Sequence, residues 1–190
     1  MQKGWEKKVL QFWFEELSLK QWFHRSDDVD RQIQENFGTL LDELNAEADT
    51  FTGESPEEIL AAIIVLDQFP RNIFRGTAQA FAYGEKALAM TRSMLDSNDK
   101  SAIQQLSPMQ RLFAFMPLEH SEKMEDQMEA VLYMAELAVE QQDSTALDSA
   151  VEHYQIIKQF GRFPHRNRIV GRESTTEELA YLKEANTFGQ

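Results

Sequence analysis

The sequence contains no cysteine among its 190 residues. This absence excludes disulfide bonds, a thiolate nucleophile and any zinc site that needs sulfur ligands, and it fits a reducing compartment. Long apolar runs are also missing, since the longest extends from Ile59 to Leu66 and is far too short to cross a bilayer. The first eight residues lack the apolar stretch of a signal peptide. We therefore expect a soluble, cytoplasmic protein that does not enter a membrane.

Positive charge is scarce. The chain has 19 Lys and Arg against 32 Asp and Glu, which gives a formal net charge of -13. A field of this sign repels a phosphate backbone, so general nucleic-acid binding is disfavoured. Hydrophobic residues (42%) and aromatic residues (11%) occur in the proportions of globular proteins. A chain of this length can bury a stable core without disulfide bonds or metal ions. We expect a single helical domain over residues 1–190.

Apolar residues recur at spacings of three and four along nearly the whole chain, and no convincing alternating strand pattern occurs. The fold class is therefore predicted to be all-α, with roughly seven to nine helices. The most apolar helix follows Ser55-Pro56-Glu57-Glu58, which supplies a cap, a first-turn proline and a capping-box glutamate, and we expect it to be central. The other principal stripes lie at 9–17, 29–44, 85–95, 124–138 and 143–160.

Two prolines are expected to interrupt helices. Pro70 should end or kink the central helix near Gln68, and Pro117 should break the helix that Ser107-Pro108 starts. Gly161 is a favourable C-cap for the helix before it. The segments between helices are then expected to be loops within the domain, at 69–76, 116–121 and 161–174.

A short pattern occurs twice, as Phe69-Pro70-Arg71-Asn72 and as Phe163-Pro164-His165-Arg166-Asn167, and each copy is followed by an arginine beside a glycine. No acid occurs between Gln68 and Gly84 or between His153 and Arg172, so both copies form islands of positive charge. Arginine offers a planar fork of donors for carboxylate or phosphate, and asparagine adds neutral donors. If the two copies meet in the fold, we predict a pocket for a small anion, with the donors Arg71, Asn72, Arg75, Arg162, Arg166, Asn167 and Arg172.

A structural role is the alternative for these arginines. They would then hold loops onto helix ends or pair with internal acids such as Asp67. Several converging cations repel one another, and each buried, uncompensated charge costs several kcal/mol. Some of the arginines must therefore meet acids, water or a ligand.

A histidine flanked by carboxylates is a candidate for proton transfer, and Glu119-His120-Ser121-Glu122 has this composition. Glu119 and His120 are expected just outside a helix, whereas Ser121 is expected to cap the next one. Glu119, His120 and His165 are the candidate catalytic residues. Whether any reaction occurs is left open. A metal site formed by the histidines His120, His153 and His165 is disfavoured, because no metal-binding spacing occurs and the arginines would oppose a cation. No metal or cofactor is predicted.

Aromatic residues gather near the N-terminus at largely helical spacing. Such a cluster could stack on a base or ring, but core packing is the simpler interpretation. Methionines later in the chain are interpreted in the same way, as residues that fill gaps in the core. The residues concerned are Phe12, Trp13, Phe14, Trp22 and Phe23, and Met109, Met116, Met124 and Met128.

Four segments together resemble a bacterial family catalogued as "domain of unknown function 924". They follow one another over essentially the whole chain, at 9–14, 66–76, 117–122 and 161–175. The second and fourth segments are the most specific, and the one small departure is Val170, where leucine is expected. The resemblance implies a compact bundle of helix pairs, a right-handed superhelix like that of tetratricopeptide repeats. It implies no established activity, so no catalytic residue is carried over from the family.

The leading functional hypothesis is a pocket for a small anionic ligand, a carboxylate or a phosphate. The alternative is a protein-interaction module, in which a concave groove between helix pairs grips an acidic peptide or a C-terminal carboxylate. A closed, deep pocket with histidine at its base would favour the first hypothesis. A broad, shallow groove would favour the second.

Overall fold

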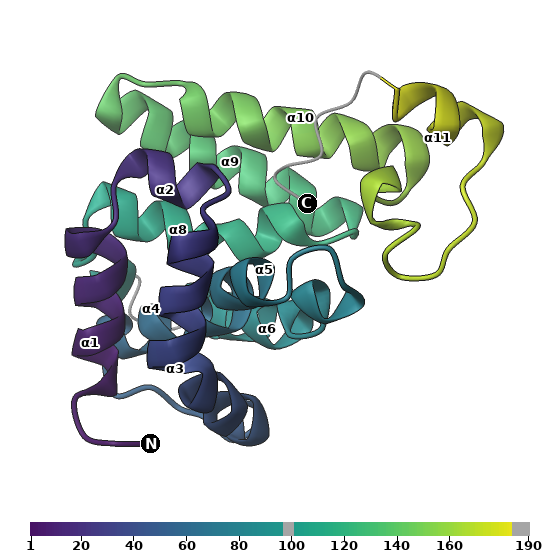
Figure 1. Cartoon of the computed structure of the whole chain (residues 1–190). Coiled ribbons are helices and arrows are strands. Elements are labelled where there is room, and N and C mark those ends of the chain that lie inside the picture. Colours follow the sequence, from purple (N-terminus) through teal and green to yellow (C-terminus); the bar gives the residue numbers. More distant parts are fainter. Residues whose placement is uncertain (97–100, 184–190) are drawn as a thin grey trace.

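The computed structural model describes residues 1–96 and 101–183, and every regular element within them is a helix, so the all-α prediction is confirmed (Figure 1). A right-handed superhelix of repeated pairs stays a prediction. No helix in this part of the chain has the length and apolar character needed to span a bilayer. The elements, with η marking π and 3₁₀ segments, are α1 (Trp5–Gln11), η1 (Phe12–Glu16), α2 (Leu19–Phe23), α3 (Asp27–Glu47), α4 (Pro56–Ile63), η2 (Ile64–Gln68), α5 (Phe69–Ile73), η3 (Ala78–Phe81), α6 (Gly84–Leu95), α7 (Ser101–Gln104), α8 (Pro108–His120), α9 (Met124–Gln141), α10 (Thr145–Phe160), η4 (Pro164–Arg166) and α11 (Thr176–Tyr181).

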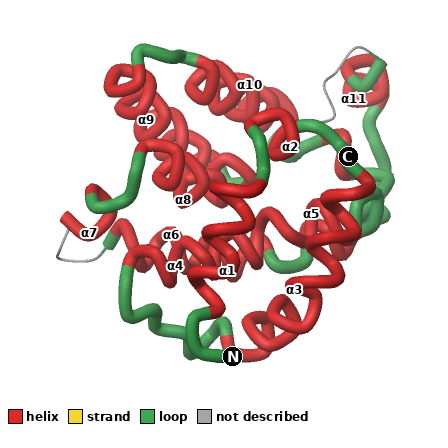
Figure 2. Tube along the Cα trace, turned by 60° about the vertical axis from the view of Figure 1, so that its left-hand side comes forward, coloured by secondary structure: helices red, strands yellow, loops and turns green. Residues whose placement is uncertain are grey.

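The central helix is the one that begins at Pro56. Its residues from Leu60 to Leu66 are at most 1% exposed, because α1, α3, α6 and α8 pack around it. On one side of this centre, α8, α9 and α10 lie side by side as two successive hairpins (Figures 1 and 2). The predicted central position of this most apolar stretch is therefore confirmed.

The chain stays helical beyond Gln68, so the predicted end of the central helix is wrong, whereas the alternative, a kink, stays a prediction. The predicted loop over 69–76 is wrong for residues 69–73, which are helical, and residues 74–76 form a turn. The chain widens into the π-helical turn η2, where the Phe69 amide donates to the carbonyl of Ile64, and then continues as α5. Pro70 stands in the first turn of α5. A proline is tolerated there because the amide hydrogen that it lacks has no necessary partner at the start of a helical segment.

Pro117 does not break α8, which runs on to His120, so the predicted loop at 116–121 is wrong as well. A proline inside a helix removes one backbone hydrogen bond and disturbs the neighbouring carbonyls. The carbonyl that loses its helical partner is that of Phe113, four residues before Pro117. The buried hydroxyl of Thr91 donates to the next carbonyl, that of Ala114, at 2.9 Å from outside the helix. As a consequence Glu119 and His120 lie in the last turn of α8, and their predicted position outside a helix is wrong.

Helix starts follow the predicted capping logic more closely. The side chains of Ser55 and Ser107 accept from the amides of Glu58 and Gln110, respectively. Gly161 ends α10 with a left-handed φ of 68°, as predicted. Ser121 was predicted to cap the start of α9, and this is wrong: Ser121 is the C-cap of α8, and the N-cap of α9 is Lys123. The segment from 161 to 174 is a loop except for η4, in agreement with the sequence.

Candidate functional site

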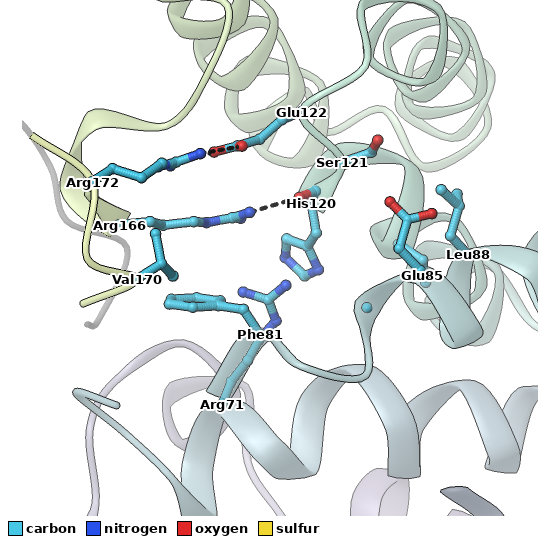
Figure 3. Close-up of a pocket in the computed structure, with 12 residues that line it drawn as sticks. Arg71, Phe81, Glu85, Leu88, His120, Ser121, Glu122, Arg166, Val170 and Arg172 are labelled. Carbon is cyan, nitrogen blue, oxygen red and sulfur yellow. Dashed lines mark hydrogen bonds and ion pairs between the residues drawn. The ribbon is translucent and has the colours of Figure 1, made fainter. Parts of the chain in front are cut away.

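The two look-alike segments come together in the folded chain. Arg71 projects from α5 and Arg166 from η4, and their guanidinium groups lie 5.5 and 4.8 Å from the ring centroid of Phe81. Figure 3 shows Phe81 between the two arginines, with His120 entering the same space from the end of α8. Arg71, His120 and Arg166 therefore form one centre, which we call the Arg–His centre.

Asp67 anchors His120 in this centre. Its carboxylate lies in the π-helical turn η2, is 2% exposed, and approaches the Nδ1 atom of His120 to 2.9 Å. Gln68 donates to the other carboxylate oxygen at 2.6 Å, and Arg71 lies at 3.3 Å. Burial alone would raise the pKa of Asp67, but His120, Arg71 and these hydrogen bonds outweigh burial and hold the pKa well below its ordinary value. Asp67 is therefore a carboxylate.

His120 is neutral at pH 7. Burial, together with the positive charge of Arg71, lowers its pKa to about 4, and the neighbouring Asp67 opposes this shift only in part. A neutral imidazole that donates its Nδ1 proton to Asp67 keeps the lone pair on Nε2, so Nε2 can accept a hydrogen bond or a proton. Figure 3 shows the ring directed into the space between Arg71 and Arg166.

Arg166 is a buried cation with little compensation. It is 8% exposed, and its Nη1 atom donates to the carbonyl of His120 at 2.9 Å. Its guanidinium lies between two aromatic rings, 4.2 Å from the centroid of Phe163 and 4.8 Å from that of Phe81. Among the described residues no carboxylate is within 4.0 Å, and Nε has no hydrogen-bond partner. Burial and the like charge of Arg71 lower the pKa of Arg166 to about 9, and the charges of Glu122 and Asp67 oppose this shift only in part.

Two cavities adjoin the Arg–His centre. The smaller one, of about 200 Å³, lies toward α6 and is lined on its far side by Glu85 and Leu88 (Figure 3). The larger one, of about 830 Å³, is bounded by residues of α2, α5, α8, α9 and α10. Both are lined by all three residues of the centre, so a ligand in either cavity would reach it.

Residues 9–186 match the model of a family described as "Bacterial protein of unknown function (DUF924)". The chain belongs to this family. It is also similar to a solved structure, that of the protein of unknown function ATU0120 from Agrobacterium tumefaciens, with 31% sequence identity and a TM-score of 0.79. The similarity covers 95% of this chain and 97% of the other. A comparison with curated proteins gives no match. The family resemblance seen in the sequence is thereby confirmed.

Three other arginines of this DUF924 protein that were predicted to bind a ligand are paired with acids. Such pairs are what the structural alternative expects, and ligand binding by these three arginines stays a prediction. Asparagine side chains from the same segments are also engaged within the protein. The closest contacts are 3.0 Å for Arg75 with Asp30, 2.6 Å for Arg162 with Glu178, 2.6 Å for Arg172 with Glu122, 2.9 Å for Asn72 with the Gln68 carbonyl and 3.1 Å for Asn167 with Ser174.

A second buried acid lies behind the centre. Glu119 is 5% exposed, and its Oε1 atom accepts from the Ser149 hydroxyl at 2.8 Å and lies 3.0 Å from Nδ1 of His153. Burial raises the pKa of Glu119 to about 7, although the Ser149 hydrogen bond opposes the shift. Burial lowers the pKa of His153 to about 3, so its ring is neutral. Glu119 can therefore exchange a proton near neutral pH.

His165, the third predicted candidate, lines the larger cavity, and its ring lies 5.5 Å from that of Phe163. Burial and the charge of Arg166 lower its pKa to about 3, which leaves it neutral. No group of three or more His, Asp or Glu residues in the described ranges is arranged to hold a metal ion.

Sequence reasoning missed Phe81 and the anchoring role of Asp67. Phe81 gave no signal, because a single phenylalanine in an acid-free stretch is ordinary. Asp67 did give one, since it precedes Arg71 by four residues and so shares a helix face with it.

Proposed function

We propose that this DUF924 protein binds a small anionic ligand, a carboxylate or a phosphate, at Arg71 and Arg166, with Nε2 of His120 placed to exchange a proton with it. The observation that carries the proposal is the buried guanidinium of Arg166, which has no carboxylate partner among the described residues. Burying an uncompensated ion costs several kcal/mol. An anion at this point would offset that cost.

The local charges leave a positive excess. Arg71 is paired with Asp67, and Arg166 feels the charges of Glu122 and Asp67 without a direct contact to either. Glu119 carries only part of a charge near pH 7, because its pKa is raised to about 7. Of the acids that line the smaller cavity, Glu122 is paired with Arg172, and the exposed Glu85 is paired with Lys123. The excess therefore remains after the internal pairs are counted.

The donors are also held in place before a ligand arrives. Stacking between Phe81 and Phe163 and the bond to the His120 carbonyl fix the plane of the Arg166 guanidinium. Each charge-assisted hydrogen bond contributes about 1.5–3 kcal/mol, so two or three such contacts account for micromolar binding after the costs of association. The rival hypothesis is an interaction module that grips an acidic peptide or a C-terminal carboxylate in a concave groove between helix pairs. It is less well supported because Arg75, Arg162 and Arg172 are engaged by internal acids.

Calorimetric titration with phosphate and with short carboxylates tests the proposal. Arg166→Met removes the charge but keeps an unbranched chain between the two rings, and we expect it to abolish binding of any anion that the wild type binds. Arg31→Gln makes the same change of charge on the exposed surface of α3 and should leave binding unchanged.

Circular dichroism establishes that each variant is folded. If Arg166→Met does not fold, Arg71→Gln takes its place, since Gln68 and His120 still satisfy Asp67. Equal binding by the wild type and by a folded variant of the centre would refute the proposal, as would the failure of every anion to bind the wild type.

A further inference from the structure

The larger cavity is far bigger than a phosphate or an acetate requires. Its volume of about 830 Å³ falls within the range of about 300–1,000 Å³ found for small-molecule sites. The anion-binding groups of the Arg–His centre occupy only one part of its wall. The rest of the wall therefore indicates what else the ligand carries.

One face of α8 runs from apolar to charged along this cavity. Met109, Leu112, Met116 and His120 follow one another at spacings of three and four, and all of them line it. From Met109 to His120 the helix rises about 16 Å, at about 1.5 Å per residue. An occupant that touches both ends of this face would place an apolar end near Met109 and an anionic end at the Arg–His centre.

The wall next to α8 comes from α2, whose Trp22 and Phe23 pack on Phe113 of α8, and it is apolar as well. Leu19, Trp22 and Phe23 line the cavity, and Leu19 and Phe23 are 62% and 50% exposed. The indole nitrogen of Trp22 donates to the carbonyl of Trp13 at 2.8 Å, so the polar atom of this side chain is already bonded within the protein. Exposed apolar side chains that gather beside a cavity mark a ligand-binding surface.

Acidic residues determine at which end of the cavity the anionic group of such a ligand would lie. Asp143, Asp148 and Glu152 stand on the α10 side of the cavity and are exposed, so they would repel an anionic group. Arg25, near the end of α2, is paired with Asp27. Among the described residues that line this cavity, the excess of positive charge is at the Arg–His centre, and the anionic group belongs there.

From this arrangement we infer, on the basis of the function proposed above, that the ligand is amphipathic: an organic acid whose anionic group lies at Arg71 and Arg166 and whose apolar chain lies in the larger cavity, along the apolar residues of α8 and α2 that line it. The test is calorimetric titration with butanoate, hexanoate, octanoate and decanoate, and with inorganic phosphate as the anion without a chain. We expect the Kd to fall about fourfold for each methylene that is buried, which corresponds to about 0.8 kcal/mol.

Two matched variants test where the apolar chain of the ligand lies. Met109→Gln places a polar group at the apolar end of the cavity and should weaken octanoate at least tenfold while leaving phosphate binding unchanged. Met128→Gln is the same substitution on the exposed face of α9, outside the cavity, and should change neither. Phe23→Ala is a second cavity variant at a half-exposed position, in case Met109→Gln does not fold.

The outcomes separate this inference from the proposed function. If phosphate or butanoate binds through Arg166 and octanoate binds no more tightly, the amphipathic ligand is wrong and anion binding stands. If octanoate binds equally well to Arg166→Met, the association is only apolar adsorption and the inference is wrong. If no member of the series and no phosphate binds the wild type, both ideas fail.

Discussion

Replacement of Glu119 by glutamine should make the protein more stable, and by an amount that grows with pH. The unfolded carboxyl has a pKa near 4.5, whereas burial raises the folded value to about 7. A raised pKa gives stability that is fully present below the unfolded value and is lost as the pH rises through the folded value. Glutamine is neutral at every pH and can still accept from Ser149 and His153, so the variant avoids this loss.

The two pKa values give the size of the effect. Between pH 5 and pH 9 the free energy of unfolding of Glu119→Gln relative to the wild type should increase by about 2.5 kcal/mol. For a chain of this length that difference corresponds to about 5–10 °C in Tm. Thermal unfolding of both proteins, followed by circular dichroism at several pH values, measures it.

Glu122→Gln is the matched control, because it changes a nearby carboxylate with the opposite shift. Burial would raise the pKa of Glu122, but the hydrogen bonds from Arg172 and the Phe163 amide outweigh burial and lower it. This variant should be less stable than the wild type at neutral pH, with the deficit shrinking as the pH falls. If the stability gain of Glu119→Gln is the same at pH 5 and pH 9, Glu119 is not the buried acid described above.

Three further substitutions test the packing around the site. Trp22→Phe removes the indole hydrogen bond to the Trp13 carbonyl and should cost about 1 kcal/mol in urea unfolding. Gly161→Ala forces a side chain into a left-handed φ of 68° where no atom of the described residues lies within 4 Å of the new Cβ, so a loss of about 1–2 kcal/mol measures backbone strain. Asp67→Asn removes the anionic partner of Arg71 and His120, and a loss of about 3–5 kcal/mol at pH 7 is expected in the same assay. An unchanged unfolding midpoint would contradict each of these assignments.

Helix starts could be predicted because the information that fixes them is local. Ser55 and Ser107 each accept a hydrogen bond from an amide three residues ahead, and the proline after each already has a helical φ. The predicted helix end at Pro70 and the predicted helix break at Pro117 were wrong because what accommodates each proline cannot be read from a local pattern. Pro70 is accommodated by the wide turn before it, and the helix around Pro117 receives a hydrogen bond from Thr91, which belongs to another helix.

The location of the candidate site could be predicted better than its composition. Acid-free stretches around Arg71 and Arg166 showed where positive charge concentrates, and the structure places these two side chains in one centre. Which arginines are internally paired could not be read from the sequence. Arg75 meets Asp30 from α3, and Arg172 meets Glu122 from the segment between α8 and α9, so both partners lie 45 or more residues away along the chain.

The π-helical turn Ile64–Gln68 also sets the azimuth at which α5 leaves the core. Successive residues of an α-helix are rotated by about 100° around its axis, so one residue fewer in this turn would swing α5 by roughly that angle. Arg71 would then point away from His120, and the buried ring of Phe69 would leave its contacts with Trp13 and Phe37. The turn directly before α5 thus decides both which aromatic ring enters the core and which charged groups face the cavity.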